Sequence, residues 1–249
     1  MKAVALKDFS LFLGAKSFEN IKAKPPAKPL KDFKMEEDDS TILRYLYKKF
    51  DPKRHLEIGT WKGFGAKLAA ENSSATVWTI NPWEGERNAD GNPVYSEPSK
   101  NVVNTKGLLE MVGNHQVNIN STIQTDSAYM IGHMYREAGL GGRVNQIYAT
   151  SKEWDTSNIP ESFFDTILID GSHEPELVVH DTRKTLPLLR SGGVMIWHDY
   201  CPVPEVIESM SSVRGVTQGI KQLGESYFKE HYSECFWIDP SWLLVGIKK

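Results

Sequence analysis

The chain has 249 residues, 40% of them hydrophobic and 24% charged, which is the balance of an ordinary globular protein able to bury a core. Its formal net charge of −3 gives no electrostatic reason to expect a nucleic-acid partner. Apolar runs stay below the length of about 18 residues that a membrane-spanning helix requires, so we expect no membrane contact.

The cysteines and the N-terminal sequence both indicate a cytoplasmic protein. Cys201 and Cys235 are too few for a disulfide framework or a zinc site, and free thiols are usual in a reducing compartment. The first apolar stretch is interrupted by Lys7 and Asp8, whereas a secretory signal needs an unbroken apolar segment.

Residues 1–35 are expected to form a basic N-terminal arm that contains Pro and Lys. They hold eight lysines and three acidic residues, and Pro25-Pro26 excludes a helix through the middle of the segment. A solvated tether, or a segment docked on its own domain, is favoured over contact with an anionic partner, because basic runs are common near chain ends. The domain itself is expected over residues 36–249.

Strands and helices alternate through this domain. Helices are expected at 36–50, 64–72, 127–139, 175–189 and within 212–228, and strands at 55–60, 75–80, 145–150, 164–170 and 192–199. Such alternation predicts an α/β fold, in which helices cover both faces of a parallel sheet. The last two strands, 233–239 and 241–249, are joined by a tight turn, so one of them must run antiparallel. The irregular stretch 81–125 is an insertion in this pattern.

Glycines follow the first strand of the alternating pattern, in "LEIGTWKGFG" (56–65), at the sheet edge where α/β proteins bind ligands. One interpretation of this turn is its resemblance to the short-chain dehydrogenases, NAD(P)-dependent reductases in which Tyr148 and Lys152 would be catalytic. That pair should lie on a helix, whereas Tyr148 falls in a strand-like run only 89 residues after Gly59. The reductase interpretation also leaves two later clusters of Asp and His without a role.

A second interpretation rests on four short motifs in order along the chain: "EIGTWKGFG" (57–65), "IDGSH" (169–173), "PLLRSGG" (187–193) and "WHDY" (197–200). Together they resemble class I S-adenosylmethionine-dependent methyltransferases over about residues 53–249, and most closely the metal-dependent branch that methylates sugars and macrolide sugars. The resemblance implies a Rossmann-like α/β sheet of seven strands, mostly parallel, with helices on both faces and an antiparallel C-terminal strand.

The resemblance also implies a site for the cofactor S-adenosylmethionine. Its methionine part is expected against the E-x-G-x-x-x-G turn, which supplies Glu57, Gly59, Thr60 and Gly63. This assignment places the cofactor at the end of the first strand of the pattern.

The ribose and the adenine are expected beside the next two strands. Asn81 stands where the family carries a carboxylate for the ribose hydroxyls; an amide still forms hydrogen bonds there, although weaker ones than a charged group. Glu84 is an alternative for this role. Ser151, after the third strand, is expected near the adenine.

Two strand ends carry acidic and imidazole groups. Asp170 ends one strand and His198-Asp199 end the next, so neighbouring strands would bring these groups to one sheet edge. Two close carboxylates repel each other unless a cation lies between them. Hard oxygen ligands suit magnesium, and an added imidazole admits Mn²⁺, Fe²⁺ or Zn²⁺. We therefore predict a metal-binding site formed by Asp170, His198 and Asp199.

The resemblance gives these residues separate roles. Asp170 and Asp199 match metal-binding positions, His173 matches the proposed general base, and His198 takes a position that is Asp in some members. An imidazole titrates near neutral pH, which suits a group that must take a proton from a hydroxyl. Simpler structural roles also stay open, since Asp170 could cap the following helix and Asp199 could pair with Arg190.

We therefore predict an S-adenosylmethionine-dependent O-methyltransferase, assisted by a divalent metal with Mg²⁺ favoured, and acting on a hydroxyl of a sugar or glycosylated natural product. Trp83 and Tyr95, among polar residues of the insertion 81–125, suit such an acceptor. A phenolic or other small metabolite as acceptor, a non-catalytic adenosyl-binding module and a homo-oligomer are left open.

Overall fold

The computed structural model describes residues 1–6, 8–9, 29–33, 35–82, 108–111, 116–119 and 131–249. Within these residues, eight strands form one sheet in the order β1-β9-β10-β8-β7-β2-β3-β6. The strands are β1 (Lys2–Ala5), β2 (Arg54–Ile58), β3 (Thr76–Asn81), β6 (Val144–Tyr148), β7 (Phe164–Ile169), β8 (Leu189–Trp197), β9 (Tyr232–Asp239) and β10 (Leu244–Lys248). β10 runs antiparallel to both of its neighbours, and the other neighbours are parallel. The mostly parallel α/β fold with an antiparallel C-terminal strand is therefore confirmed.

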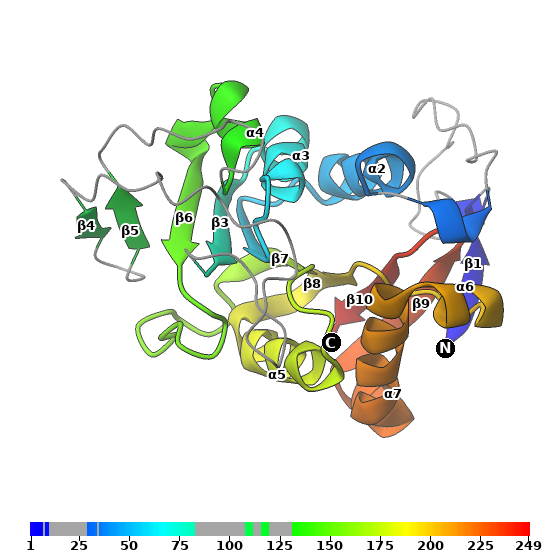
Figure 1. The fold of residues 1–249 in the computed structure, drawn as a ribbon. Coiled ribbons are helices and arrows are strands. Elements are labelled where there is room, and N and C mark those ends of the chain that lie inside the picture. The colour runs from blue at the N-terminus through cyan, green and yellow to red at the C-terminus, as the bar shows by residue number, and fades with distance from the viewer. Residues whose placement is uncertain (7, 10–28, 34, 83–107, 112–115, 120–130) are drawn as a thin grey trace.

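Helices cover both faces of the sheet (Figure 1). One face carries α2 (Ser40–Phe50), α3 (Phe64–Asn72) and α4 (His133–Glu137), and the other carries α5 (Pro175–Thr185), α6 (Pro204–Ser209) and α7 (Ser211–His231). Shorter 3₁₀ or π turns lie at η2 (Leu30–Asp32), η3 (Met35–Asp39), η5 (Gly141–Arg143) and η6 (Leu186–Leu188).

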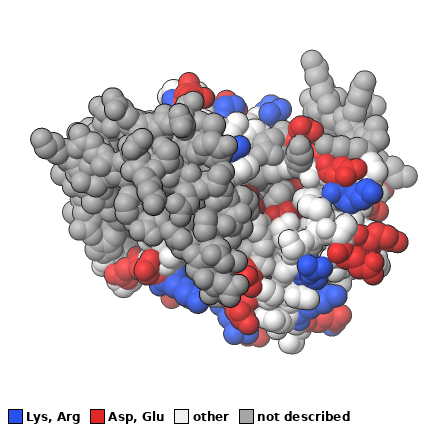
Figure 2. Space-filling model, in the orientation of Figure 1, with Lys and Arg blue, Asp and Glu red and all other residues white. Residues whose placement is uncertain are grey.

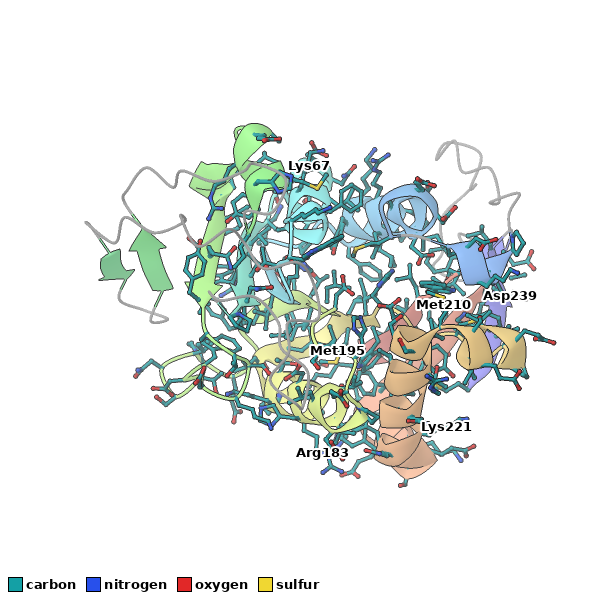
Figure 3. All side chains as sticks on the ribbon, in the orientation of Figure 1. Lys67, Arg183, Met195, Met210, Lys221 and Asp239 are labelled. Atoms are coloured by element: carbon teal, nitrogen blue, oxygen red, sulfur yellow. The ribbon has the colours of Figure 1, made fainter. Side chains whose placement is uncertain are left out.

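Each face of the sheet packs its own hydrophobic core. Because successive strand residues point to opposite faces, Val194 and Ile196 of β8 pack with α2 and α3, whereas Met195 and Trp197 pack with α5 and α7. Figure 3 shows Met195 inside the second of these layers. Burial on both faces explains why the central strands read as nearly continuous apolar runs.

The strand β1 is an eighth strand where the sequence predicted seven. It comes from the predicted N-terminal arm, and it pairs in parallel with β9 over Phe236–Asp239. The fully buried Phe9 follows it, with its ring 5.4 Å from that of Tyr45 and 6.1 Å from that of Phe236. Of the two alternatives for this segment, docking on its own domain describes these first residues.

Much of the predicted insertion 81–125 lies outside the described residues, as does the stretch 10–28 of the N-terminal segment. Two short strands of the insertion, β4 (Leu108–Met111) and β5 (Gln116–Ile119), form an antiparallel pair, with β5 beside β6 (Figure 1). The residues predicted to suit an acceptor, Trp83 and Tyr95, fall outside the described part, as does Glu84.

Strand register brings the functional candidates to one level. Ile58 of β2 pairs with Ile80 of β3 and Ile169 of β7, and Ile169 pairs with Trp197 of β8. The next residue of each strand therefore lies at the same carboxyl edge of the sheet: Gly59, Asn81, Asp170 and His198.

Charged residues of both signs lie on the surface of the described ranges. No helix there is both long and apolar enough to cross a bilayer. Figure 2 shows acidic and basic side chains interspersed on the face that it draws, without a continuous basic patch among the coloured residues.

Candidate functional site

An acidic and imidazole cluster lies at the carboxyl edge of β7 and β8. The Asp170 N–H donates to the carbonyl of Ile58 at 2.8 Å, and the His198 N–H donates to the carbonyl of Ile169 at 3.1 Å. Sheet hydrogen bonding thus continues one residue beyond both strands and fixes these backbones. His198 Nδ1 lies 3.0 Å from Asp170 Oδ1 and 3.5 Å from Asp199 Oδ2. The predicted convergence of the two strand ends is observed.

His173 joins the cluster from the turn that precedes α5. Its Nε2 lies 2.7 Å from Asp199 Oδ2, and its side chain is 19% exposed. Helix α7 packs tightly on this turn, because a Cβ at Gly215 would lie 1.9 Å from the carbonyl oxygen of His173. Asp199 itself adopts a φ of +56°, a left-handed conformation that Asp tolerates better than most residues.

The structure adds a residue that the sequence did not indicate, Asp39. It is the last residue of η3, its exposed fraction is 0%, and its Oδ2 lies 3.2 Å from His198 Nε2. Its Oδ1 accepts a hydrogen bond from the backbone N–H of Trp242 at 3.3 Å. The imidazole of His198 is thus placed between Asp39 on one side and the pair Asp170 and Asp199 on the other.

The charges in this cluster are strongly coupled. Burial opposes protonation of His198, but the carboxylates of Asp170 and Asp199 outweigh it and raise the pKa of His198 well above its usual value. Burial likewise opposes ionisation of Asp199, but the imidazoles of His198 and His173 prevail and hold the pKa of Asp199 far below its usual value. Burial raises the pKa of Asp39, with His198 acting in the opposite direction. The carboxylates of this cluster therefore stabilise a positive charge placed between them.

The donor set fits a divalent cation. In the part of the chain that the structure describes, Asp170, His173 and Asp199 each offer a ligand atom, and these atoms lie within 4.8 Å of one another. The predicted ligands were Asp170, His198 and Asp199, so this group holds His173 in place of His198. His198 nevertheless lies beside both carboxylates, and His173 is paired with Asp199. Carboxylate oxygens suit Mg²⁺, and one imidazole added to them extends the choice to Mn²⁺, Fe²⁺ or Zn²⁺.

The glycine turn after β2 packs directly against this cluster. Gly59 and Gly63 have φ values of +100° and +86°, which favour glycine. A Cβ at Gly59 would lie 2.0 Å from the carbonyl oxygen of Asp170, and one at Gly63 would lie 2.7 Å from the Cα of Gly132. The loop 59–63 and the acidic cluster therefore form one continuous edge.

Asn81, predicted to face the ribose of a cofactor, holds this loop. Its Oδ1 accepts hydrogen bonds from the backbone N–H groups of Thr60 at 3.1 Å and Trp61 at 3.0 Å. Its Nδ2 donates to the carbonyl of Pro82 at 2.9 Å, and its exposed fraction is 8%. Asn81 thus fixes the course of the loop through two backbone contacts.

A buried chain of polar side chains supports the loop from below. The Thr79 hydroxyl donates to Glu57 Oε2 at 2.5 Å and lies 2.6 Å from the Thr60 hydroxyl, which accepts a hydrogen bond from Gln146 Nε2 at 2.9 Å. Glu57 and Thr60 are only 1% and 2% exposed, so their side chains face this chain rather than solvent. The sequence prediction missed Thr79 and Gln146, whose one signal is a polar side chain inside a strand.

Two further predicted residues lie along β6 and after it. The backbone carbonyls of Ser151 and Trp154 each accept a hydrogen bond from Lys184 Nζ at 2.6 Å, so the segment that starts at Ser151 is anchored to α5. Tyr148 is the last residue of β6, and its hydroxyl accepts a hydrogen bond from Arg136 Nη2 at 3.1 Å. Tyr148 therefore lies on a strand, whereas the catalytic Tyr of short-chain dehydrogenases lies on a helix.

A family model described as a methyltransferase domain matches residues 56–200, more than half of the chain. The chain belongs to this methyltransferase family. The matched range runs from β2 to the residue after Asp199, so the methyltransferase match includes both the glycine loop and the cluster of Asp170, His173, His198 and Asp199. The predicted resemblance to class I S-adenosylmethionine-dependent methyltransferases is confirmed, and the reductase alternative is wrong.

Solved structures share the fold of this methyltransferase. A protein named as an O-methyltransferase from Klebsiella pneumoniae matches with a TM-score of 0.51 and 18% identity, over 93% of this chain and 95% of that one. A Bacillus cereus O-methyltransferase in complex with S-adenosylhomocysteine gives 0.50 and 16%, over 98% and 90%. A Podospora anserina methyltransferase bound to S-adenosylhomocysteine gives 0.52 and 14%, over 85% and 78%. At these identities the likeness establishes the fold. A search of curated protein sequences gave no match.

Proposed function

We propose that this methyltransferase transfers the methyl group of S-adenosylmethionine to a hydroxyl of a sugar or glycosylated natural product, with a divalent cation, Mg²⁺ favoured, at Asp170 and Asp199. The observation that carries the proposal is the convergence of Asp170, His173 and Asp199 within 4.8 Å, directly beside the glycine loop. A cofactor and an acceptor bound at one edge would have their reacting atoms close together.

The cofactor is assigned to the loop 59–63 and the two strand ends beside it. Its methionine part would lie against the backbone of Gly59, Thr60 and Gly63, because Gly turns allow a ligand close to the backbone. The ribose would lie near Asn81 and the adenine near Ser151. S-adenosylmethionine supplies a methyl group bound to its sulfonium sulfur. When the acceptor oxygen forms the new O–CH₃ bond, the S–CH₃ bond breaks and S-adenosylhomocysteine is the leaving group.

His173 is assigned as the general base. A hydroxyl becomes a good nucleophile only when its proton is removed, and a cation at Asp170 and Asp199 would lower the pKa of that hydroxyl and orient it. Asp199 Oδ2, 2.7 Å from His173 Nε2, would stabilise the imidazolium that forms when His173 takes the proton. The His173–Asp199 pair therefore supports the transfer of a proton from the acceptor hydroxyl to His173.

The acceptor class rests on the resemblance to sugar O-methyltransferases. A phenol is the alternative, because it needs the same removal of a hydroxyl proton. The cytoplasmic location and a homo-oligomeric state likewise stay predictions.

A screen of hydroxylated acceptors tests the proposal, with S-adenosylhomocysteine release as the readout. We expect turnover with a sugar or glycoside acceptor, and loss of turnover with a chelator or with Asp170→Asn. Turnover that persists in chelator would contradict the role of the cation, and turnover with phenols alone would contradict the acceptor class.

A further inference from the structure

Asp39 is a fully buried carboxylate at the start of α2. It stands at the N-cap of α2, where an Asp side chain commonly accepts a hydrogen bond from the first turn of its own helix. In the described structure it forms no such cap, and its side chain turns instead to His198 and Trp242. A carboxylate with an exposed fraction of 0% is costly to bury unless it is well partnered, so its partner His198 is the feature to explain.

Asp39 is held against His198 from two sides. The backbone N–H of Trp242 binds its Oδ1, while Oδ2 faces His198 Nε2. The indole of Trp242 is itself fixed, because the ring of Phe33 stacks on it with centroids 6.4 Å apart and planes 28° apart. The carboxylate is therefore a rigid contact for one nitrogen of the ring.

The other nitrogen of His198 faces the cluster. A hydrogen bond from Nε2–H to the Asp39 carboxylate, over 3.2 Å, commits that nitrogen of the ring to Asp39. Nδ1 then points between Asp170 Oδ1, at 3.0 Å, and Asp199 Oδ2, at 3.5 Å. Although these oxygens are close, Nδ1 is a buried atom for which the described residues provide no aligned hydrogen bond.

We propose that Asp39 is a positioning residue for the cation site: it holds His198 by Nε2–H, so that Nδ1 joins Asp170 and Asp199 as a ligand. The proposal rests on the proposed function, since it concerns how Asp39 positions a predicted ligand, His198, of the same cation. His198 Nδ1 and Asp170 Oδ1 are 3.0 Å apart, so one cation could contact both atoms. A carboxylate behind a ligating imidazole orients the ring and increases its basicity.

The test is Mn²⁺ affinity, measured by calorimetry on the full chain without acceptor. We expect Asp39→Asn to weaken Mn²⁺ binding about 10- to 100-fold, the range found when the partner behind a metal-bound histidine is removed. Asp32→Asn is the matched control, because Asp32 lies in the same N-terminal segment but is exposed, and its Mn²⁺ affinity should equal that of the wild type. S-adenosylmethionine binding without metal should be the same in all three proteins, which shows that the fold is intact.

Pulsed electron paramagnetic resonance of bound Mn²⁺ identifies the ligand. We expect an imidazole ¹⁴N coupling in the wild type that disappears in His198→Gln. If Asp39→Asn binds Mn²⁺ as tightly as the wild type with the same coupling, the role of Asp39 is overturned. If the wild type binds no Mn²⁺, the cation in the proposed function is overturned and the role of Asp39 with it.

A measurement on the wild-type protein removes any dependence on the folding of Asp39→Asn. Imidazole ¹⁵N resonances report which ring nitrogen carries the proton, and His198 can be assigned by the loss of its signal in His198→Gln. With Mg²⁺ bound we expect the proton of His198 on Nε2. A proton on Nδ1 in the Mg²⁺-bound protein would overturn the proposal.

Discussion

The backbone of Gly59 lies so close to that of Asp170 that a single methyl group would not fit between them: a Cβ at Gly59 would be 2.0 Å from the carbonyl oxygen of Asp170. This contact joins the glycine loop to the acidic cluster. Gly59 and Asp170 are 111 residues apart in the sequence. Their backbones can approach this closely in space only because residue 59 has no side chain.

Gly59→Ala should therefore disrupt both the loop and the cluster. Because the substitution meets backbone and also requires a φ of +100°, we expect a loss of at least about 3 kcal/mol in the free energy of unfolding, or no folded protein. Gly142→Ala is the control, since a Cβ there meets nothing within 4 Å, and it should change the stability by less than about 0.5 kcal/mol. Equal stabilities in urea unfolding would show that the contact is wrong.

His173→Ala should separate catalysis from cofactor binding. Loss of a general base typically lowers turnover about 10²- to 10⁴-fold, while the glycine loop that is assigned to the cofactor is left unchanged. We expect calorimetric S-adenosylmethionine affinity to stay within about twofold of the wild type. His231→Asn, at the end of α7, should leave both quantities unchanged. A fully active His173→Ala enzyme would remove His173 from the mechanism.

Asn81 tests how the loop is held. Asn81→Ala removes the oxygen that accepts two backbone hydrogen bonds from Thr60 and Trp61, and we expect S-adenosylmethionine affinity to fall about tenfold. Asn81→Asp keeps that acceptor and adds a charge beside the assigned ribose, so it should bind the cofactor at least as tightly as the wild type. Unchanged affinity in Asn81→Ala, measured by calorimetry, would mean that the loop holds its shape without this side chain.

Glu57 predicts a pH dependence of stability. Burial raises the pKa of Glu57 well above its usual value, so the folded protein keeps a proton that the unfolded chain loses above about pH 4.5. The free energy of unfolding should then fall as the pH rises above 4.5, because the folded state binds more protons.

Glu57→Gln, which is neutral at every pH, should lack this loss. Its stability relative to the wild type should increase with pH by up to about 1.4 kcal/mol per unit above pH 4.5, as measured by urea unfolding. Glu225→Gln, in an exposed ion pair on α7, is the control and should run parallel to the wild type. If the free energy of unfolding of Glu57→Gln also runs parallel to that of the wild type across pH, the Glu57 carboxyl is ionised in the folded protein.

Phe9 tests whether the first residues belong to the domain. Its fully buried ring packs against Tyr45 and Phe236, so Phe9→Ala should cost about 3–5 kcal/mol of stability in urea unfolding. Phe9→Leu, which retains most of the apolar volume, should lose clearly less. A change near zero for Phe9→Ala would return this segment to the role of a solvated arm.

The central strands and their acidic ends could be predicted because each depends on local sequence. The strands are apolar runs that stop at polar residues, and parallel topology alone brings Asp170 and Asp199 to one edge. The glycine turn could also be predicted, because closely spaced glycines indicate a turn with positive φ values. Gly59 and Gly63 adopt such values, which other residues rarely do.

Other features depend on tertiary contacts that no local pattern reveals. Asp39 is one of four consecutive acidic residues that all suit the start of a helix, and nothing in the sequence distinguishes the one that reaches His198. The strand β1 has four residues, too few to show a period, and it forms only because β9 offers an unpaired edge. Asn81 was assigned to the ribose by position, and its two backbone contacts in the loop could be seen only in three dimensions.

The most direct test of a combined cofactor and cation site is a crystal structure of the chain with S-adenosylhomocysteine and Mn²⁺, with anomalous data collected for manganese. We predict the homocysteine part of the ligand along the loop 59–63, and an anomalous peak between Asp170 and Asp199 within bonding distance of His198 Nδ1. S-adenosylhomocysteine in the loop without a manganese peak at these residues would contradict the account, and a ligand bound elsewhere would contradict the cofactor site itself.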